Sequence, residues 1–426
     1  MKKVSIIGAT ISGNRGAESM LSTEIGRIRE HEPDVAFNVF SYYPGEDRKL
    51  CTMPNIAIYS AAPAYLVLVI FPFACLLGLF KIMGLRFFKP FFPKAVRALN
   101  DSDVLIDISG VSFMDGRVKF IPFNVLTIFP AMAVGTPVVK FSQALGPFGN
   151  PLVRIPARIF LSGCARIFAR GKATEKNLRG LKICGNIIDS AADIAFLHKP
   201  DYALSVENPA YIKALADKLE KMKKRGQTVI GLCPSSVVAA RAHREGWNYP
   251  VLLCEIIRLL SENGFAVLLF PNATRQKSRK LRNNDLPVIE KAARYLAAFN
   301  EYPDNLLIVT KDINTAGIKT LLEYCDLGIV SRFHAMISCL VMEKPVVVMG
   351  WGHKYQEVMD QFGLGKFVFD YKNKNPKLLL DKVVSALAQK RDISENIKNR
   401  LPEVQRRAYR QFEFLFDMLA RKRNEK

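Results

Sequence analysis

The stretch that decides the fold is DLGIVSRFHAMISCLVMEKPVVVMGWGHKYQEVMDQFG, residues 326–363. It reads as an apolar strand, a Ser-Arg-Phe-His turn, a helix, a second apolar strand, and a Gly-Trp-Gly-His-Lys turn that opens another helix. Turns at the carboxyl ends of strands form the ligand crevice of an open α/β sheet. We therefore expect Arg332 and His334 from the first turn to lie near His353 and Lys354 from the second. This gathering of cations favours an anionic ligand.

Short apolar runs alternate with helical stretches through the rest of the chain. Strands are predicted at 4–9, 35–40, 104–108, 137–141 and 165–169, and again at 228–233, 265–270, 305–310 and 367–371. This alternation is typical of a mostly parallel, doubly wound sheet. The order predicts an α/β protein with two Rossmann-like domains that face each other across a cleft.

Chain length and a polar connection predict the domain boundary. The 426 residues exceed what one hydrophobic core usually supports. The segment 197–209 is polar and contains two prolines, as an interdomain connection does. We therefore place an N-terminal domain at 1–198, and a C-terminal domain that includes the last helices at 199–426.

Composition indicates a globular, cytoplasmic protein with an anionic partner. Hydrophobic residues make up 49% of the chain, and 61 Lys and Arg against 39 Asp and Glu give a net charge of +22. That balance favours nucleic acid, phospholipid or phosphorylated metabolites as partners. The cysteines are scattered without a CxxC pair, a pattern typical of reduced cytosolic thiols that supports neither zinc nor disulfides. The N-terminal run MKKVSIIGATIS is interpreted as a first strand rather than a signal peptide.

A hydrophobic and basic insertion interrupts the first domain at about 61–97. Its apolar part, AAPAYLVLVIFPFACLLGLF at 61–80, is as long as a membrane span, and no Asp or Glu occurs from residue 48 to residue 100. A true span would place strands of one sheet on opposite sides of the bilayer. A helix or hairpin that dips into one leaflet avoids this, while burial in a large domain is the alternative. We expect peripheral association with the inner face of the cell membrane.

The turn SGNRGAES at 12–19 follows the first predicted strand and precedes a helix. Its glycines allow close backbone approach, and the helix N-terminus offers free N–H groups to an anion or a sugar. A tight turn without a ligand is the alternative, and Arg15 and Glu18 at the carboxyl end of a strand favour a site. Asn14, Arg15 and Glu18 are the candidate site residues of this turn.

Polar residues also follow the later strands of the first domain. Asp107 ends one strand, Ser142 and Gln143 end the next, and Arg170 ends the fifth. A carboxylate in an apolar strand is costly unless it is hydrogen-bonded, so Asp107 fits either a catalytic or a loop-capping role. The amide of Gln143 suits recognition of sugar hydroxyls.

His334 differs from the other histidines in its surroundings. It lies next to Arg332 in the first turn of a helix, where the helix dipole and the cation favour a neutral imidazole. A neutral imidazole serves as a base or a hydrogen-bond partner. We therefore prefer a functional to a structural role for His334.

The segments GNRGAESM, DISGVSFMDG, SQALGPF, DIAFL, SRFHAMISCL and PVVVMGWGHKYQEVMDQFGL occur in this order over almost the whole chain. In this the sequence resembles the polysaccharide pyruvyl transferase family, which includes the colanic-acid pyruvyl transferases. The resemblance implies a fold similar to the two-domain GT-B glycosyltransferases. It also implies transfer of pyruvate from phosphoenolpyruvate to a sugar of a cell-surface polysaccharide or its lipid-linked precursor.

The donor implied by this resemblance carries a phosphate and a carboxylate, which call for cationic side chains. Arg332, Lys354, His353 and Arg170 are the candidates for binding it. Ketal formation also needs an acid and a base near the donor, and His334 is expected to be one of these. No metal ligand cluster is evident in the sequence, so phosphoenolpyruvate is expected as co-substrate without a metal or cofactor.

The acceptor implied by the resemblance is a sugar or a lipid-linked oligosaccharide, predicted to bind the N-terminal domain. We expect Asp107 or Glu18 to orient or deprotonate its hydroxyl. The candidates for binding the acceptor are Asn14, Arg15, Ser142 and Gln143.

Two further functions share the predicted fold. A GT-B glycosyltransferase would bind a nucleotide sugar in place of phosphoenolpyruvate. A non-catalytic envelope-assembly protein is supported by Ala17 and Gly171, where members of the family commonly have Asp and Glu. Nucleic-acid binding is the weakest alternative, because the cations lack interleaved aromatic residues or a recognised module.

Overall fold

The computed structural model describes residues 2–183, 187–205, 207–275, 283–298, 302–350 and 352–424. Backbone contacts divide the chain into two compact units. Unit 1 comprises Met1–Ser12, Ser19–His198 and Val404–Lys426, and unit 2 comprises Gly13–Glu18 and Lys199–Glu403. This division departs from the predicted domains 1–198 and 199–426 at two segments. The chain from 404 onward packs on the sheet of unit 1, and residues 13–18 pair with the backbone of unit 2.

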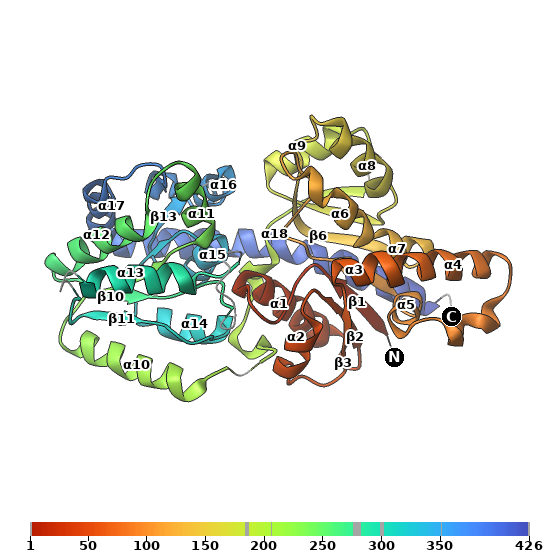
Figure 1. Ribbon diagram of the computed structural model, residues 1–426, viewed down its shortest axis with the longest axis horizontal. Helices are drawn as coiled ribbons and strands as arrows, with labels where there is room; N and C mark the ends of the chain where they lie inside the picture. The colour runs from red at the N-terminus through yellow and green to blue at the C-terminus, as the bar shows by residue number, and fades with distance from the viewer. Residues whose placement is uncertain are drawn as a thin grey trace. The chain divides into compact units, whose positions relative to one another are not determined.

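Unit 1 is built on an eight-stranded sheet in the order β3-β2-β1-β4-β6-β7-β8, with β5 paired to β6 (Figure 1). All of these pairings are parallel. The sequence pattern did not reveal β3 and β8, because both are edge strands with partly exposed side chains. The strands are β1 (Lys3–Ile7), β2 (Ala36–Ser41), β3 (Ile56–Ser60), β4 (Val104–Asp107), β5 (Val111–Ser112), β6 (Val138–Leu145), β7 (Arg166–Arg170) and β8 (Ile188–Ala191).

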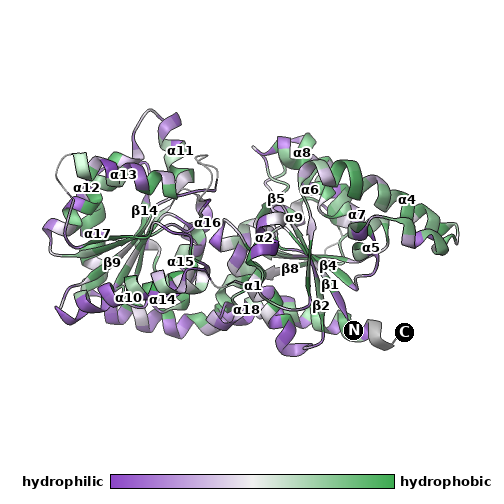
Figure 2. Ribbon diagram, turned by 60° about the horizontal axis from the view of Figure 1, so that its bottom comes forward, coloured by the Kyte–Doolittle hydropathy of each residue, from purple (hydrophilic) through white to green (hydrophobic). Residues whose placement is uncertain are grey.

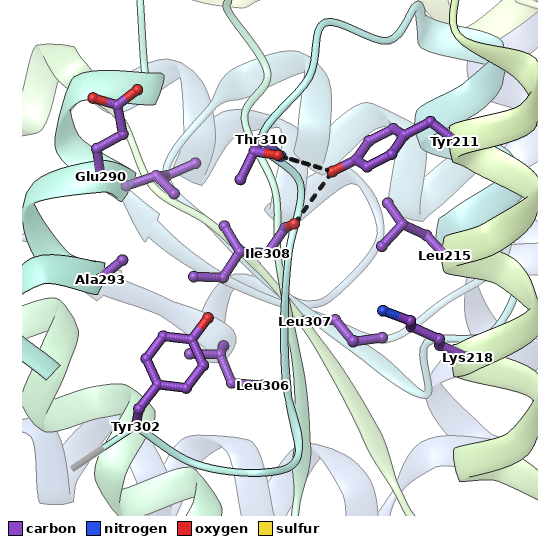
Figure 3. Close-up of a pocket in the computed structure, with 11 residues that line it drawn as sticks. Tyr211, Leu215, Lys218, Glu290, Ala293, Tyr302, Leu306, Leu307, Ile308 and Thr310 are labelled. Atoms are coloured by element: carbon purple, nitrogen blue, oxygen red, sulfur yellow. Dashed lines mark hydrogen bonds between the residues drawn. The ribbon is translucent and has the colours of Figure 1, made fainter. Parts of the chain in front are cut away.

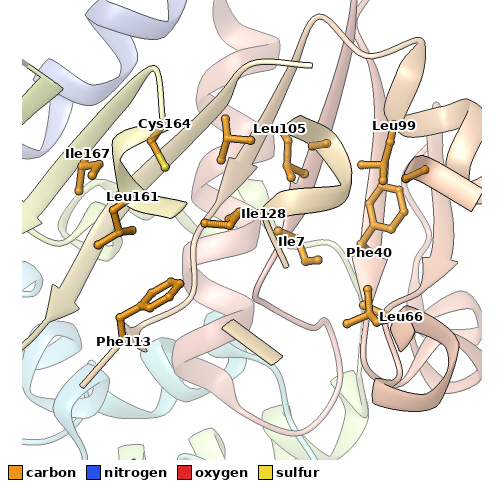
Figure 4. Close-up of a cluster of buried hydrophobic side chains, with 14 of the residues drawn as sticks. Ile7, Phe40, Leu66, Leu99, Leu105, Phe113, Ile128, Leu161, Cys164 and Ile167 are labelled. Atoms are coloured by element: carbon orange, nitrogen blue, oxygen red, sulfur yellow. The ribbon is translucent and has the colours of Figure 1, made fainter. Parts of the chain in front are cut away.

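Helices enclose the core of unit 1. Buried side chains from the strands and from the packed helices form one cluster that includes Ile7, Phe40, Leu105, Ile128 and Leu161 (Figure 4). The C-terminal helix α18 (Lys390–Asn424) adds Phe412, whose ring lies 5.6 Å from that of Phe141 on β6. The other helices are α1 (Arg15–His31), α2 (Pro44–Leu50), α5 (Lys94–Asn100), α6 (Ile121–Leu126), α7 (Phe129–Ala133), α8 (Pro151–Ser162) and α9 (Lys172–Gly180).

The predicted insertion forms a long helix that packs on unit 1 by one stripe. The segments α3 (Pro63–Tyr65), η1 (Leu66–Ile70) and α4 (Phe71–Ile82) run continuously, and a 3₁₀ segment, η2 (Arg86–Phe91), follows them. Gly78 allows the close approach of α4 to α7, because a Cβ at this position would lie 2.1 Å from the carbonyl oxygen of Ala133. The inward stripe is Leu66, Ile70, Ala74 and Leu77.

Unit 2 contains a six-stranded parallel sheet in the order β11-β10-β9-β12-β13-β14 (Figure 1). This is the strand order of a Rossmann dinucleotide-binding sheet. The chain adds β10 and β11 on one side of β9, and then adds β12, β13 and β14 on its other side. In sheets of this order ligands ordinarily bind at the carboxyl ends of the first and fourth strands, which are β9 and β12 here. The strands are β9 (Val229–Cys233), β10 (Ala266–Leu269), β11 (Leu306–Ile308), β12 (Leu327–Val330), β13 (Val346–Gly350) and β14 (Val368–Asp370).

The helices of unit 2 follow the predicted alternation with its strands. The stretch 326–363 folds as β12, a turn, α15, β13, a turn and α16. The helices are α10 (Pro209–Lys224), α11 (Ser236–Arg244), α12 (Tyr249–Glu262), α13 (Leu286–Ala298), α14 (Thr315–Leu322), α15 (Phe333–Val341), α16 (His353–Gln361) and α17 (Pro376–Ala388).

Candidate functional site

The two cationic turns of the stretch 326–363 follow neighbouring strands, since β12 and β13 pair in parallel register. Arg332 is the N-cap of α15, and His334 lies in the first turn of that helix. His353 and Lys354 open α16. The Phe333 ring contacts both turns, because its centroid lies 5.5 Å from that of the His334 ring and 4.7 Å from the Nζ of Lys354. The aromatic ring therefore connects the imidazole to the ammonium group.

Gly16 of the GNRG turn lies directly against the imidazole of His334. A Cβ added at Gly16 would be 2.1 Å from Nδ1 and 2.5 Å from Cγ of that ring. The sequence suggested that this glycine allows a ligand to approach the backbone. In the structure the group that approaches the backbone of Gly16 is the side chain of His334, which is 318 residues further along the chain.

Backbone hydrogen bonds hold the GNRG turn in unit 2. The N–H of Arg15 donates to the carbonyl of Asn272 at 3.0 Å, and the N–H of Thr274 donates to the carbonyl of Gly13 at 2.7 Å. The side chain of Asn14 accepts from the N–H of Gly16 at 3.0 Å and so caps the start of α1. These bonds fix the position of Gly16, and through it that of His334.

The side chains of Arg15 and Glu18 form a buried ionic network within unit 2. Arg15 is 1% exposed and donates to Glu207 at 3.3 Å and to Asp312 at 3.1 Å. Glu18 accepts from the N–H of Thr315 at 2.9 Å, at the start of α14. Burial raises the pKa of Glu18, although Arg15 and Thr315 act against this shift. Both side chains are engaged within unit 2, and the acceptor roles suggested for this turn stay predictions.

Arg332 is held by a buried carboxylate that the sequence did not single out. Asp285 is 0% exposed and accepts Nε of Arg332 at 3.1 and 3.0 Å and also its Nη2. The same carboxylate accepts backbone N–H groups from Ser236, Asn272 and Ala273. Asp285 thus fastens the loops after β9 and β10 to the turn after β12.

The two terminal nitrogens of Arg332 differ in their hydrogen bonds. Nη2 also donates to the hydroxyl of Ser236 at 2.8 Å, whereas Nη1 makes no hydrogen bond within the part of the chain that the structure describes. Nη1 is not among the buried polar atoms that lack a partner, so it reaches solvent. Burial acts to lower the pKa of Arg332, but Asp285 outweighs it and raises the pKa, which keeps the guanidinium charged.

Replacing Gly16 by alanine is expected to push the imidazole of His334 out of its position. The new methyl group overlaps the ring, and such overpacking costs about 1–3 kcal/mol of stability. Denaturant unfolding and the NMR signal of the His334 ring report the two effects. Gly45→Ala is the matched control, because Gly45 also lies in a helix and an added Cβ meets nothing within 4 Å. Equal stability and an unshifted histidine signal in both variants would contradict the contact.

The predicted residues of unit 1 form a second, separate cluster. Asp107 and Lys140 are both 0% exposed and form an ion pair at 2.5 Å. Burial would raise the pKa of Asp107, but the ammonium of Lys140 and bonds from Lys140 and Ser109 together hold it below its usual value. Gln143 donates to the backbone carbonyl of Asp107 at 2.7 Å and accepts the hydroxyl of Ser112 at 2.6 Å. Asp107 is therefore ionised and held within the fold.

Ser142 and Arg170 are also engaged within unit 1. The hydroxyl of Ser142 lies 2.9 Å from the carbonyl of Ala192 and 2.9 Å from Gln411 of α18. Arg170 pairs with Asp193 at 2.6 Å and donates to the carbonyl of Gly110 at 2.8 Å. These contacts give both side chains a structural role. The binding roles expected for Ser142 and Arg170 stay predictions.

Sequence reasoning missed Lys140 and Asp285. A lysine inside the apolar run VVKFSQ was a usable signal, since an unpaired buried ammonium is costly. Asp285 gave no comparable signal, because an aspartate just before a helix is ordinarily a cap. Within the described ranges, no group of His, Cys, Asp and Glu could hold a metal ion.

A pocket of about 430 Å³ lies away from these residues, along the edge strand β11 between α10 and α13 (Figure 3). Its lining is mainly apolar, and its polar members are Tyr211, Lys218, Glu290, Tyr302 and Thr310. The hydroxyl of Tyr211 bonds to the carbonyl of Ile308 and the backbone of Thr310. None of the predicted site residues lines this pocket. Its single lysine, Lys218, is opposed by the carboxylate of Glu290 on α13, so the pocket does not favour a donor with two anionic groups.

The two parallel α/β sheets define a GT-B-like fold, and solved structures agree. A putative UDP-N-acetylglucosamine 2-epimerase from Listeria monocytogenes superposes with a TM-score of 0.58 at 12% identity, covering 97% of this chain and 95% of that one. HepE from Anabaena in complex with UDP-glucose gives a TM-score of 0.57 at 11% identity over 99% and 100% of the two chains. At these identities the likeness establishes the fold alone.

Within this fold class, the chain belongs to the polysaccharide pyruvyl transferase family, whose model matches residues 14–353. A curated relative is the amylovoran biosynthesis protein AmsJ of Erwinia amylovora. It is 21% identical over 406 residues, which cover 93% of this chain and 94% of AmsJ. The match begins at Asn14, inside the GNRG turn, and includes the turn that carries His334.

Proposed function

We propose that this protein transfers pyruvate from phosphoenolpyruvate to two hydroxyls of a sugar, in a cell-surface polysaccharide or its lipid-linked precursor, and so forms a ketal. Membership in the pyruvyl transferase family supports the reaction class, and similarity to a protein of amylovoran biosynthesis supports a polysaccharide acceptor. The enzyme acts in the cytoplasm, where phosphoenolpyruvate is available.

The observation that carries the proposal is that the turns with Arg332, His334 and Lys354 follow neighbouring parallel strands. Nη1 of Arg332 reaches solvent, His334 lies two residues further along in the first turn of α15, and Lys354 follows the neighbouring strand. A guanidinium nitrogen and an ammonium group are suited to the phosphate and carboxylate of phosphoenolpyruvate. The imidazole of His334 is suited to proton transfer. His353, exposed at the start of α16, belongs to the same donor side.

The reaction balances without a redox partner. The methylene carbon of phosphoenolpyruvate gains a proton, one sugar hydroxyl bonds to the central carbon, and the C–O bond to phosphate breaks. The second hydroxyl then closes the ketal. Of the two hydroxyl protons, one is accounted for by the new methyl group and the other by the released phosphate. We assign His334 to proton transfer. Because the carboxylates of Asp107 and Glu18 are fully buried, we assign them to orienting the acceptor hydroxyl rather than to deprotonating it.

A thermal-shift titration of the full chain tests the donor. A ligand at about 100 times its Kd stabilises the folded state by about 2.7 kcal/mol. Phosphoenolpyruvate is expected to raise the melting temperature of the wild type, and Lys354→Ala is expected to weaken this effect. Lys224→Ala is the control, since the exposed Lys224 ends α10 just before the amino end of β9, at the opposite edge of the sheet from the turns after β12 and β13.

The same titration with UDP-glucose and UDP-N-acetylglucosamine separates the two enzyme functions. Stabilisation by a nucleotide sugar and none by phosphoenolpyruvate would overturn pyruvyl transfer in favour of a glycosyltransferase. Stabilisation by neither class would favour the non-catalytic alternative.

A further inference from the structure

The long helix of the insertion leaves most of its apolar surface exposed. Of its most hydrophobic 18-residue window, only 28% is buried. Leu68 is 70% exposed, Ile82 85%, and Phe91 in the following 3₁₀ segment 82%. Contiguous apolar surface of this kind marks an interaction site on a soluble protein.

Helix α8 is apolar on both of its faces. Val153, Ala157 and Leu161 point into the core of unit 1. Its outer side chains Leu152, Ile155 and Ile159 are 66%, 57% and 61% exposed. A surface helix ordinarily places polar residues on that side. The outer face of α8 therefore has no explanation in the packing of unit 1.

A row of aromatic rings connects the two helices. Phe71 of α4 lies 6.0 Å from Phe129 of α7, and Phe129 lies 5.4 Å from Phe160 of α8. Figure 2 shows the apolar colouring running along α4, α7 and α8. We call the exposed apolar side chains of 63–91 and of α8 the apolar face. It is formed entirely within unit 1.

The sheet topology excludes a membrane span for the long helix. Strand β3 precedes the helix and β4 follows it, and both belong to the sheet of unit 1. The chain must therefore enter and leave on the same side of any bilayer. A helix that lies along one leaflet meets this requirement, whereas a helix that crosses does not.

Basic side chains outnumber acidic ones around the apolar face, where Asp101 pairs with Lys89 of η2 and the carboxylate of Asp115 accepts backbone N–H groups just before α8. The sequence contains no Asp or Glu from 48 to 100 or from 116 to 174. Arg154 and Arg158 alternate with the outer side chains of α8, and both are exposed. Cations that flank an interfacial apolar helix are attracted to anionic headgroups by about 1 kcal/mol each. This complementarity identifies the partner as an anionic lipid surface rather than a neutral apolar protein.

We propose that α8 and the 63–91 segment together form one docking surface for an anionic bilayer, with both helices lying in the interface of a single leaflet. The proposal does not depend on the pyruvyl transfer reaction. It adds α8, with Arg154 and Arg158, to the segment 61–97 whose membrane association the sequence already predicted.

Sedimentation of the full chain with vesicles tests this. Phosphatidylcholine vesicles with and without phosphatidylglycerol are the probes. The wild type is expected to bind the anionic vesicles more tightly, and Leu152→Ser/Ile155→Ser/Ile159→Ser and Leu68→Ser/Leu79→Ser are each expected to lower the partition coefficient by about tenfold or more. Arg154→Gln/Arg158→Gln should lose about 30-fold on anionic vesicles only, as about 1 kcal/mol for each of the two cations implies.

The matched control is Leu378→Ser/Val384→Ser, which removes two exposed apolar side chains of α17 in unit 2. It should bind as the wild type does. Undiminished binding of the α8 variant, or no binding of the wild type to anionic vesicles, would overturn the proposal. Light scattering without lipid measures the oligomeric state. If the wild type is a dimer and both apolar variants are monomers, the apolar face is a contact between copies of the chain, and the proposal is overturned.

Discussion

The variant His334→Ala is expected to lose pyruvyl transfer by about 10²–10⁴-fold in kcat, the range typical of removing a general acid or base. Its melting temperature should change little, and phosphoenolpyruvate should still stabilise the protein through Arg332 and Lys354. The reason is that the imidazole is assigned to proton transfer, whereas the cations are assigned to binding. Phosphate release from phosphoenolpyruvate in the presence of an acceptor measures the turnover.

The control for this variant is His243→Ala, since His243 is exposed on α11 and outside both clusters. It should retain wild-type turnover. Full turnover of His334→Ala would show that the assignment to His334 is wrong. Loss of turnover together with loss of the phosphoenolpyruvate-induced stabilisation would show that the residue serves in binding instead.

The variant Asp285→Ala is expected to lower the free energy of unfolding by about 3–5 kcal/mol. It leaves the buried guanidinium of Arg332 without its counter-ion, and it leaves three backbone N–H groups without their acceptor. Because Arg332 also loses its fixed orientation, the stabilisation by phosphoenolpyruvate should fall as well. Denaturant unfolding followed by circular dichroism measures the first effect, and a thermal-shift titration measures the second.

Asp304→Ala is the matched control in unit 2, because Asp304 is exposed just before β11. It should change the free energy of unfolding by less than about 0.5 kcal/mol. Asp285→Asn keeps the shape and should fall between the two. If Asp285→Ala unfolds like the control, the carboxylate does not hold the strand-end loops together.

Much of the fold could be predicted from the sequence, because its signals are local. The stretch 326–363 showed two buried strands and two helix starts, and the structure has β12, α15, β13 and α16 there. The predicted GT-B-like class is confirmed by the parallel sheets and by solved structures. Edge strands β3 and β8 escaped notice, since half-exposed strands lack the continuous apolar run of a central strand.

The candidate site was predictable only in part. The stretch 326–363 placed Arg332, His334 and Lys354 at neighbouring strand ends, and the pairing of β12 with β13 agrees. The sequence could not show which polar groups are already engaged. Asp107 is paired with Lys140, Arg15 with Glu207 and Asp312, and Arg332 with Asp285. Such pairs join residues that are tens or hundreds of positions apart, so no local pattern contains them.

The sequence by itself determined that this chain folds as two parallel α/β sheets, that cations follow adjacent strands near its C-terminus, and that an apolar insertion interrupts its first sheet. Periodicity, turn residues and charge runs are local properties, and they sufficed for these conclusions. Only the tertiary structure decided that Gly16 lies against His334, that Asp285 orients Arg332, and that the outer face of α8 continues the insertion. Each of these depends on contacts between distant segments, whose free energy arises only when the sheet has brought those segments together.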